Sequence, residues 1–414
     1  MENPIRSFFQ TDRVLNLTYR GITILSKFLL SILIVKKLDI SELGVFGIFQ
    51  TTITLLVYVL GFDFYTYNAR EILKEKANNI SFFVGNQLVF HGLVYCLVLP
   101  LSLLLFTYNV VATEYLIYFY LLLITEHLSQ EIYRILIVLK KSVVASFTLL
   151  LRSGLWVLLI YMLWNSLWTD QKLTDIFLLW FFGAFFSIMV GLSYIKPNFN
   201  YKVDWSWIKK GLKIATPFFI ATIFYKVIEF SGRYFLDFYW TKNEVGVFSF
   251  FSSISNALFV LVHSTVIIVM SPYLIAAANE SNKAFRLIYR KFANQVFLTA
   301  GAGSLLAAVG IIPLLNFMDN PQLDNNIAAY FLLLLAVVFF CLSYIPHYAL
   351  YAYHSDKQLL YASVIGAGIN VLMNFMVVPK YGVYGASFVQ ALSMIALLIA
   401  KGIMLQRSSY AKSQ

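Results

Sequence analysis

The stretch from Lys226 to Asp237 reads K-V-I-E-F-S-G-R-Y-F-L-D and decides how the whole chain is interpreted. Its charged residues are Lys226, Glu229, Arg233 and Asp237, at i, i+3, i+7 and i+11, within an arc of about 80° on one helix face. The flanking residues, A-T-P-F-F-I-A-T-I-F-Y and F-Y-W, are nearly all apolar. Charges at such depth in a bilayer are costly and normally face protein or a watery cavity. The stretch is therefore either a soluble amphipathic helix or the lining of a polar path through a membrane protein.

The composition of the chain decides for the membrane protein. Its 414 residues are 60% hydrophobic and only 12% charged, with a mean hydropathy of +0.75. Soluble domains carry about 25% charged residues, so this shortfall predicts many membrane spans. The net charge of +11 is spread between apolar segments, which favours an anionic membrane surface over nucleic acid. Cys96 and Cys341 are expected to be free, buried thiols.

Twelve apolar segments are long enough to span a bilayer. They cover residues 14–35, 44–66, 82–106, 115–138, 143–164, 174–194, 212–238, 247–275, 292–315, 326–352, 358–378 and 383–405. If the N-terminus is cytoplasmic, the inside segments hold 22 Lys and Arg and the outside segments hold 5. This bias over short loops predicts that both termini are cytoplasmic.

The chain also repeats itself. S-E-L-G-V-F-G-I-F (Ser41 to Phe49) matches N-E-V-G-V-F-S-F-F (Asn243 to Phe251) at an offset of 202 residues, and each opens the second span of its half. The repeat predicts two six-helix lobes related by a pseudo-two-fold axis along the membrane normal. We expect an N-terminal lobe over residues 1–195, a cytoplasmic linker over 196–211, and a C-terminal lobe over 212–414.

Three stretches resemble a known family. They are K-K-L-D-I-S-E-L-G-V-F-G-I-F after the first span, L-G-F-D-F-Y-T-Y-N-A-R-E-I at the inner end of the second, and G-A-G-I-N-V-L-M-N-F-M-V-V-P-K-Y-G-V-Y-G-A-S-F-V-Q across the last two. With them the chain resembles, over its whole length, the multidrug/oligosaccharidyl-lipid/polysaccharide exporter superfamily. Within it, the resemblance is to the Wzx-type O-antigen flippases.

The resemblance implies a multi-pass transporter of the bacterial inner membrane that works by alternating access around a central lumen. Its substrate would be an undecaprenyl-pyrophosphate-linked O-antigen repeat unit, moved from the cytoplasmic to the periplasmic leaflet for lipopolysaccharide biosynthesis. Its partners would be membrane lipids and, beyond them, a polysaccharide polymerase and a chain-length regulator. No cofactor, metal site or nucleic acid is expected.

Such a substrate needs cations for its pyrophosphate. Arg13, Arg20 and Lys27 are spaced seven apart and form one stripe that climbs to mid-bilayer in the first span. Arg13 and Arg20 can alternatively be interfacial anchors. The candidate lumen cations are Arg20, Lys27, Arg152, Lys226 and Arg233.

The candidate coupling or pairing acids are Glu229, Glu131, Glu126 and Asp63. Glu229 and Arg233 are spaced at i,i+4 and can alternatively neutralise each other as a structural bridge, with Glu229 also within reach of Lys226. Glu131 and Arg152 are almost equidistant from the turn at 140–142, so they are expected at equal depth, either paired or with Arg152 on the substrate. For Asp63 and Arg70, one heptad apart, helix capping or lobe packing is the simpler explanation.

Two further expectations concern sugars and coupling. Interior tyrosines such as Tyr225 and Tyr234 could stack on sugar rings. The offset of 202 also places Lys27 opposite Glu229 in the repeat, so the two are expected to interact across the lumen in one state.

Two rival functions remain open. One is an ion-coupled drug or metabolite exporter of the same superfamily. A cationic drug would favour a lumen with more acidic than basic residues, whereas the spans hold four deep basic residues and three deep acidic ones. The other is a membrane-embedded polysaccharide polymerase or ligase, which usually has a large external loop. The chain has no phosphate-binding loop, zinc-protease motif or nucleophile elbow, so it is not expected to be an enzyme.

Overall fold

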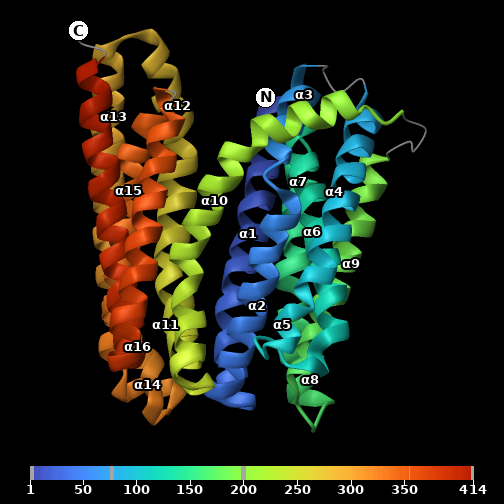
Figure 1. Ribbon diagram of the computed structural model, residues 1–414, viewed down its shortest axis with the longest axis vertical. Helices are drawn as coiled ribbons and strands as arrows, with labels where there is room; N and C mark the ends of the chain where they lie inside the picture. Colours follow the sequence, from blue (N-terminus) through green and yellow to red (C-terminus); the bar gives the residue numbers. More distant parts are fainter. Residues whose placement is uncertain (1–3, 75–78, 197–201, 354, 412–414) are drawn as a thin grey trace. The chain divides into compact units, whose positions relative to one another are not determined.

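The computed structural model describes residues 4–74, 79–196, 202–353 and 355–411, and their side chains except at 4–13, 17 and 408–411. Throughout these ranges the regular structure is helical (Figure 1). The α-helices are α1 (Pro4–Lys37), α2 (Ile40–Gly61), α3 (Tyr65–Lys74), α4 (Ile80–Ser102), α5 (Leu104–Thr107), α6 (Leu116–Val138), α7 (Ser142–Leu150), α8 (Trp156–Ser166), α9 (Leu173–Ile195), α10 (Trp205–Tyr239), α11 (Lys242–Val262), α12 (Ile268–Glu280), α13 (Asn282–Met318), α14 (Pro321–Asn325), α15 (Ile327–Ala352) and α16 (Asp356–Ala411). Two π-helical turns, η2 (Leu151–Leu155) and η3 (His263–Ile267), join α7 to α8 and α11 to α12.

The helices account for the predicted spans. Ten helical segments of the described chain are long and apolar enough to cross a membrane. The 23-residue α6 is an eleventh candidate, although its charged residues make it less apolar. The long α16 is interrupted at Gly382, where φ is 51°, so it supplies two spans. The prediction of an all-α, multi-pass membrane protein of about twelve helices is confirmed.

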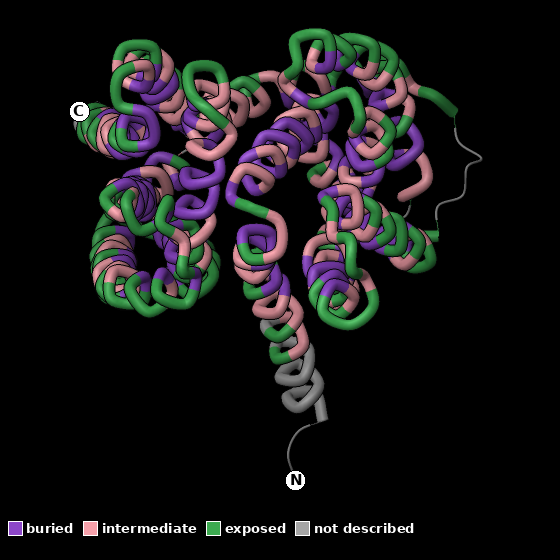
Figure 2. Tube along the Cα trace, turned by 90° about the horizontal axis from the view of Figure 1, so that it is seen from below, coloured by how far each residue is buried: buried purple, intermediate pink, exposed green. Residues whose placement is uncertain are grey.

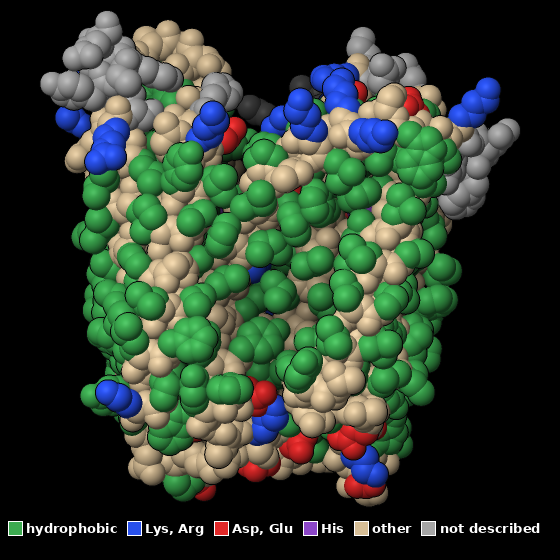
Figure 3. All heavy atoms as spheres, in the orientation of Figure 1, with side chains coloured by type: hydrophobic (Ala, Val, Ile, Leu, Met, Phe, Trp, Pro, Cys, Tyr) green, Lys and Arg blue, Asp and Glu red, His purple; other side chains and the backbone are tan. Residues whose placement is uncertain are grey.

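Contacts divide the chain into two compact units. The first unit comprises residues 1–38 and 48–219, and the second comprises 39–47 and 220–414. The beginning of α2 therefore packs with the second unit, and the beginning of α10 packs with the first. Within each unit, buried positions face neighbouring helices and exposed positions face outward (Figure 2). Hydrophobic side chains cover the visible flanks of the helices, while most visible charged side chains gather near the helix ends, as a bilayer requires (Figure 3).

The predicted linker needs a correction, because α10 begins at Trp205, inside the stretch that was expected to be a loop. Asp204 caps this helix: its Oδ1 accepts hydrogen bonds from the backbone N–H groups of Ser206 at 2.9 Å and Trp207 at 3.0 Å. Hydrogen bonds from the Ser206 side chain and the Trp207 backbone hold the pKa of Asp204 below its usual value. The buried Trp207 ring then docks on Phe64 and Tyr67.

The two cysteines differ from expectation in one respect. Both are free, but Cys96 is exposed and only Cys341 is buried. Cys96 lies on α4, whose later residues include the exposed Leu93, Leu97 and Leu101. An apolar stretch alone does not say which face of a membrane helix meets lipid, so burial of Cys96 did not follow from its neighbours.

Candidate functional site

In the first unit, Arg152 pairs with Glu126 inside the membrane-spanning region. Arg152 Nε lies 3.7 Å from Glu126 Oε2, and the Trp180 indole N–H donates to Glu126 Oε1 at 2.6 Å. Arg152 belongs to the π-turn η2, against which α1 packs. Lys27, on α1, is exposed, and it interacts electrostatically with both Arg152 and Glu126. Two basic side chains, Lys27 and Arg152, therefore lie near one acidic side chain, Glu126.

Of the two alternatives for Arg152, the pairing with Glu131 is wrong. Glu131 Oε1 instead lies 2.5 Å from Arg134 NH1, and its Oε2 accepts from Gln87 Nε2 at 2.6 Å. Equal distance from a turn fixes depth but not direction. Glu126 and Glu131 are five residues apart, so they point about 140° apart around α6, and only Glu126 faces η2.

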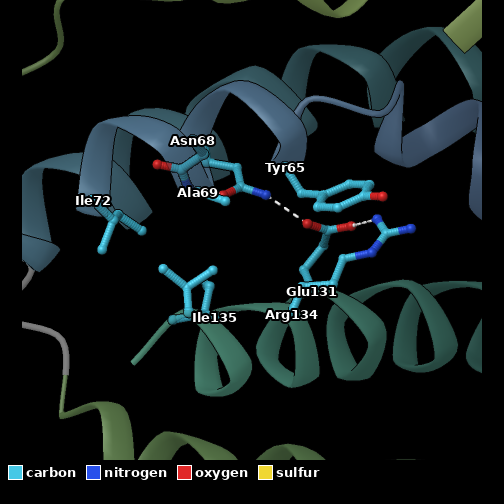
Figure 4. Close-up of a pocket in the computed structure, with 9 residues that line it drawn as sticks. Tyr65, Asn68, Ala69, Ile72, Glu131, Arg134 and Ile135 are labelled. Atoms are coloured by element: carbon cyan, nitrogen blue, oxygen red, sulfur yellow. Dashed lines mark hydrogen bonds and ion pairs between the residues drawn. The ribbon is translucent and has the colours of Figure 1, made fainter. Parts of the chain in front are cut away.

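Glu131 belongs to a buried polar network between α3, α4 and α6 (Figure 4). Glu131 and Arg134 line a small pocket with Tyr65 and Asn68. The Arg134 guanidinium lies 3.8 Å from the centre of the Tyr65 ring, and the Asn68 amide donates to Gln87. These contacts satisfy the buried carboxylate within its own unit.

The network continues through two histidines, His91 of α4 and His127 of α6. His91 and His127 pack with ring centroids 4.5 Å apart, and Tyr95 OH hydrogen-bonds His127 Nδ1 at 2.6 Å. The signal was present in the sequence, because Gln87, His91 and Tyr95 follow one another at i, i+4 and i+8 on one face of α4.

Asp63 and Arg70 have separate roles. Asp63 is buried in the sharp turn between α2 and α3, where its φ is 49°. Its carbonyl oxygen accepts from the Thr66 N–H at 3.0 Å and the Thr66 hydroxyl at 2.8 Å. The Arg70 guanidinium instead lies 5.7 Å from the centre of the Phe218 ring. Asp63 thus helps to begin α3.

Arg20 lies within its own helix bundle. Its Nε is 3.4 Å from Ser146 Oγ and its NH2 is 3.5 Å from Tyr133 OH. Both are long contacts on α7 and α6, so Arg20 does not reach Lys27's neighbours Arg152 and Glu126. The side chain of Arg13 lies outside the described residues.

In the second unit, the alternative of a structural bridge between Glu229 and Arg233 is also wrong. Glu229 Oε2 lies 2.7 Å from Lys226 Nζ. Arg233 Nε instead donates to Ser249 Oγ at 3.1 Å, and its guanidinium lies 5.6 Å from the centre of the Phe248 ring. Helix spacing allowed either cation to pair with Glu229, and packing of α11 against α10 gives Arg233 another partner.

The pairings leave unbalanced positive charge in the spans. Among the described side chains, Lys27 and Arg233 have no carboxylate within ion-pair distance. Lys401 is another: it is 5% exposed, and its Nζ lies 3.3 Å from Ser343 Oγ. Asp237, by contrast, pairs with Lys242 where α10 ends.

The third of the quoted stretches, across the last two spans, contributes to helix packing. Asn370 and Asn374, both buried, hydrogen-bond each other at 3.0 Å. Asn370 also bonds Ser393 at 3.0 Å and Ser231 of α10. Further along, the N–H of Val383, next to Gly382, donates to Glu244 at 3.2 Å. The motif therefore ties both halves of α16 to α10 and α11.

The repeated motif forms a close crossing of two helices. A Cβ on Gly44 would lie 2.0 Å from the carbonyl oxygen of Lys242, and a Cβ on Gly246 would lie 1.9 Å from that of Ile40. Gly44 and Gly246 occupy matching positions at the offset of 202, as do Ile40 and Lys242. The contact is therefore reciprocal. All four residues belong to the second unit.

The comparisons show what class of fold this is. No family model and no curated protein matches the sequence. The chain nevertheless has the fold of the transporters of the multidrug/oligosaccharidyl-lipid/polysaccharide exporter superfamily.

Three solved structures illustrate the likeness. An inward-facing multidrug resistance MATE family transporter of this superfamily superposes with a TM-score of 0.74 at 15% identity, covering 96% of this chain and 99% of that one. The lipid II flippase MurJ gives 0.73 at 12% identity, covering 95% and 87%. A superfamily transporter from Pyrococcus furiosus, described as having a binding pocket of reversed polarity, gives a TM-score of 0.64 at 14% identity, covering 97% of this chain and 95% of that one.

Proposed function

We propose that this protein is a flippase that moves an anionic lipid-linked oligosaccharide across the bacterial inner membrane by alternating access. The proposed substrate is an undecaprenyl-pyrophosphate-linked O-antigen repeat unit, carried from the cytoplasmic to the periplasmic leaflet. The fold is compatible with this role, because one of the similar structures is a lipid II flippase. The substrate class rests on the charges of the spans.

The observation that carries the proposal is the surplus of cations. Lys27 lies in a span, and its ammonium has no carboxylate within ion-pair distance among the described side chains. Leaving a charge so deep in a bilayer costs free energy unless something compensates it. A pyrophosphate supplies compensating charge and accepts several charge-assisted hydrogen bonds. We therefore propose Lys27 and Arg152 of the first unit, and Lys226 and Arg233 of the second, as candidate cations for the pyrophosphate, with Arg20 nearer the helix end.

The acids fit this assignment as exchange partners. Glu126 holds Arg152 at 3.7 Å, which is longer than the 2.7 Å of Lys226 to Glu229. An incoming pyrophosphate competes with these carboxylates for their cations. Because a ligand shifts a conformational equilibrium only through differential contacts, this exchange would link substrate binding to rearrangement of the protein.

A gene deletion tests the function. A strain that lacks this protein should lose surface polysaccharide and accumulate lipid-linked repeat units in the cytoplasmic leaflet. Restoration by the wild-type gene, but not by Lys27→Glu at equal protein level, is the expected result. Normal polysaccharide together with increased sensitivity to cationic drugs would support the alternative, a multidrug exporter of the same fold.

A further inference from the structure

The second unit contains a continuous row of aromatic and histidine side chains. On α15, Phe340, Tyr344, His347, Tyr348 and Tyr351 fall within about 100° of arc, so they share one face. Adjacent rings are in contact: the centroid of the Tyr344 ring lies 5.1 Å from that of Phe340, 5.4 Å from that of His347 and 6.0 Å from that of Tyr348. Tyr351 extends the row, 6.2 Å from Tyr348.

The row begins beside a cation that the proposed function assigns to the substrate. Tyr225 of α10 stacks on Phe340 with centroids 5.3 Å apart and planes 19° apart. Lys226 Nζ lies 5.4 Å from the centre of the same Tyr225 ring. The Phe230 ring lies at a similar distance, 5.1 Å from Lys226 Nζ. A ligand whose anionic group is held at Lys226 therefore lies next to the start of the row.

The inner end of the row is core packing, because Phe340 is buried in a hydrophobic cluster against which Tyr344 packs. Two features distinguish the rest of the row. Tyr344, His347 and Tyr348 are only partly buried, and Tyr351 is 43% exposed, whereas core aromatics such as Phe250 are fully covered. The row also contains an ionisable side chain, His347, and such groups in spans normally face protein or water rather than lipid.

The direction of the row also differs from that of an interfacial aromatic belt. A belt lies at one depth in the membrane. From Phe340 to Tyr351 the row instead advances about 16 Å along the helix axis. It thus reaches from deep in the span almost to the end of α15 at Ala352.

We propose that this row is the binding track for the oligosaccharide of the substrate. Sugar rings present an apolar C–H face and a rim of hydroxyl groups. Tyrosine rings offer an apolar face with a hydroxyl at the tip, and a histidine can donate or accept a hydrogen bond. The track deepens the proposed function and rests on it: Lys226 holds the pyrophosphate, and the sugars lie along α15 towards Tyr351.

The chain supplies a matched control for testing the track. Phe331 lies on the opposite side of α15, nine residues before Phe340, and it is 43% exposed, as Tyr351 is. Tyr351→Ala and Phe331→Ala therefore remove similar rings of equal exposure from opposite faces of one helix. Tyr351→Leu, which keeps apolar volume, replaces Tyr351→Ala should the latter lower the melting temperature.

The experiment measures binding of three probes to the full-length protein in nanodiscs. They are undecaprenyl diphosphate, the same lipid carrying a tetrasaccharide, and the free tetrasaccharide. We expect Tyr351→Ala to weaken binding of both sugar-bearing probes about tenfold while changing undecaprenyl diphosphate less than about twofold. Phe331→Ala should bind all three as the wild type does, and Lys226→Gln should weaken both lipids.

The outcomes separate this proposal from the proposed function. Equal weakening of all probes by Tyr351→Ala, or no weakening of any, would overturn the sugar track and leave the flippase proposal standing. Wild-type protein that binds undecaprenyl diphosphate no better than undecaprenol would overturn the flippase proposal. In that case the free tetrasaccharide still decides whether the row binds sugar.

Discussion

Gly44 and Gly246 each lie against the backbone of the helix that carries the other. A Cβ on either glycine would come within 2.0 Å of a carbonyl oxygen, that of Lys242 or of Ile40. The two glycines match in the internal repeat, so one sequence motif, used twice, forms both sides of the crossing. Small residues allow membrane helices to approach this closely, which explains a glycine at both positions.

Alanine at either glycine should disturb the crossing equally. Because the added methyl overlaps a backbone atom, we expect Gly44→Ala and Gly246→Ala each to destabilise the protein by about 1–3 kcal/mol. Gly92→Ala and Gly301→Ala are the controls, since nothing lies within 4 Å of a Cβ there. Melting temperatures of the four purified variants check this. A Gly44→Ala protein as stable as Gly92→Ala would show that the close approach is not required.

The Glu126–Arg152 pair should be separable from Glu131. Removing one partner of a buried ion pair costs about 3–5 kcal/mol, so Glu126→Gln and Arg152→Ala should lower the protein level. The exchange Glu126→Arg with Arg152→Glu should restore it in part. Restoration by exchanging Glu131 with Arg152 instead would contradict the observed pairing. Normal level with lost transport in Arg152→Ala would mean that Arg152 serves the substrate alone.

Lys27 and Glu229 are equivalent in the repeat, and we expect them to interact during the transport cycle. Lys27→Glu and Glu229→Lys should each reduce surface polysaccharide in a complemented deletion strain, and the double exchange should recover part of it. Loss in both single variants without recovery in the double would remove the pair but keep the need for cations. Wild-type amounts of surface polysaccharide from Lys27→Ala and Lys27→Glu at normal protein level would contradict both the Lys27–Glu229 pair and the need for a cation at Lys27.

The orientation in the membrane is a further prediction from the distribution of basic residues. Alkaline phosphatase and fluorescent-protein fusions should report periplasmic positions after Ser41, Asn109, Asp170, Asn243, Asp319 and Lys380. Both termini should report the cytoplasm. Cytoplasmic signals at two or more of the six positions would contradict the twelve-span topology.

The number and approximate limits of the helices could be predicted from the sequence because long apolar segments are a strong signal. The start of α10 was missed because its capping by Asp204 and the docking of Trp207 are local interactions in a polar stretch. The boundary between the last two spans was predicted between residues 378 and 383, and α16 is interrupted there, at Gly382.

The candidate site was predicted less well than the fold. Spacing along one helix identified which residues share a face, as for Lys226 and Glu229. It did not identify the partner of each charged side chain. Arg233 bonds Ser249 of α11, and Arg152 pairs with Glu126 of α6. Both partners come from other helices, and their direction depends on packing that a single sequence does not reveal. The row on α15 was likewise not recognised, because aromatic residues are common throughout the chain.

Translocation by purified protein tests the central claim most directly. Proteoliposomes would carry undecaprenyl-diphosphate tetrasaccharide in both leaflets, and a glycosidase added outside would cleave only the sugars it can reach. We predict that wild-type protein brings the inner-leaflet pool to the enzyme, and that Lys27→Ala at equal incorporation does so far more slowly. Cleavage that stops at the outer-leaflet pool with wild-type protein, as in empty liposomes, would contradict the account.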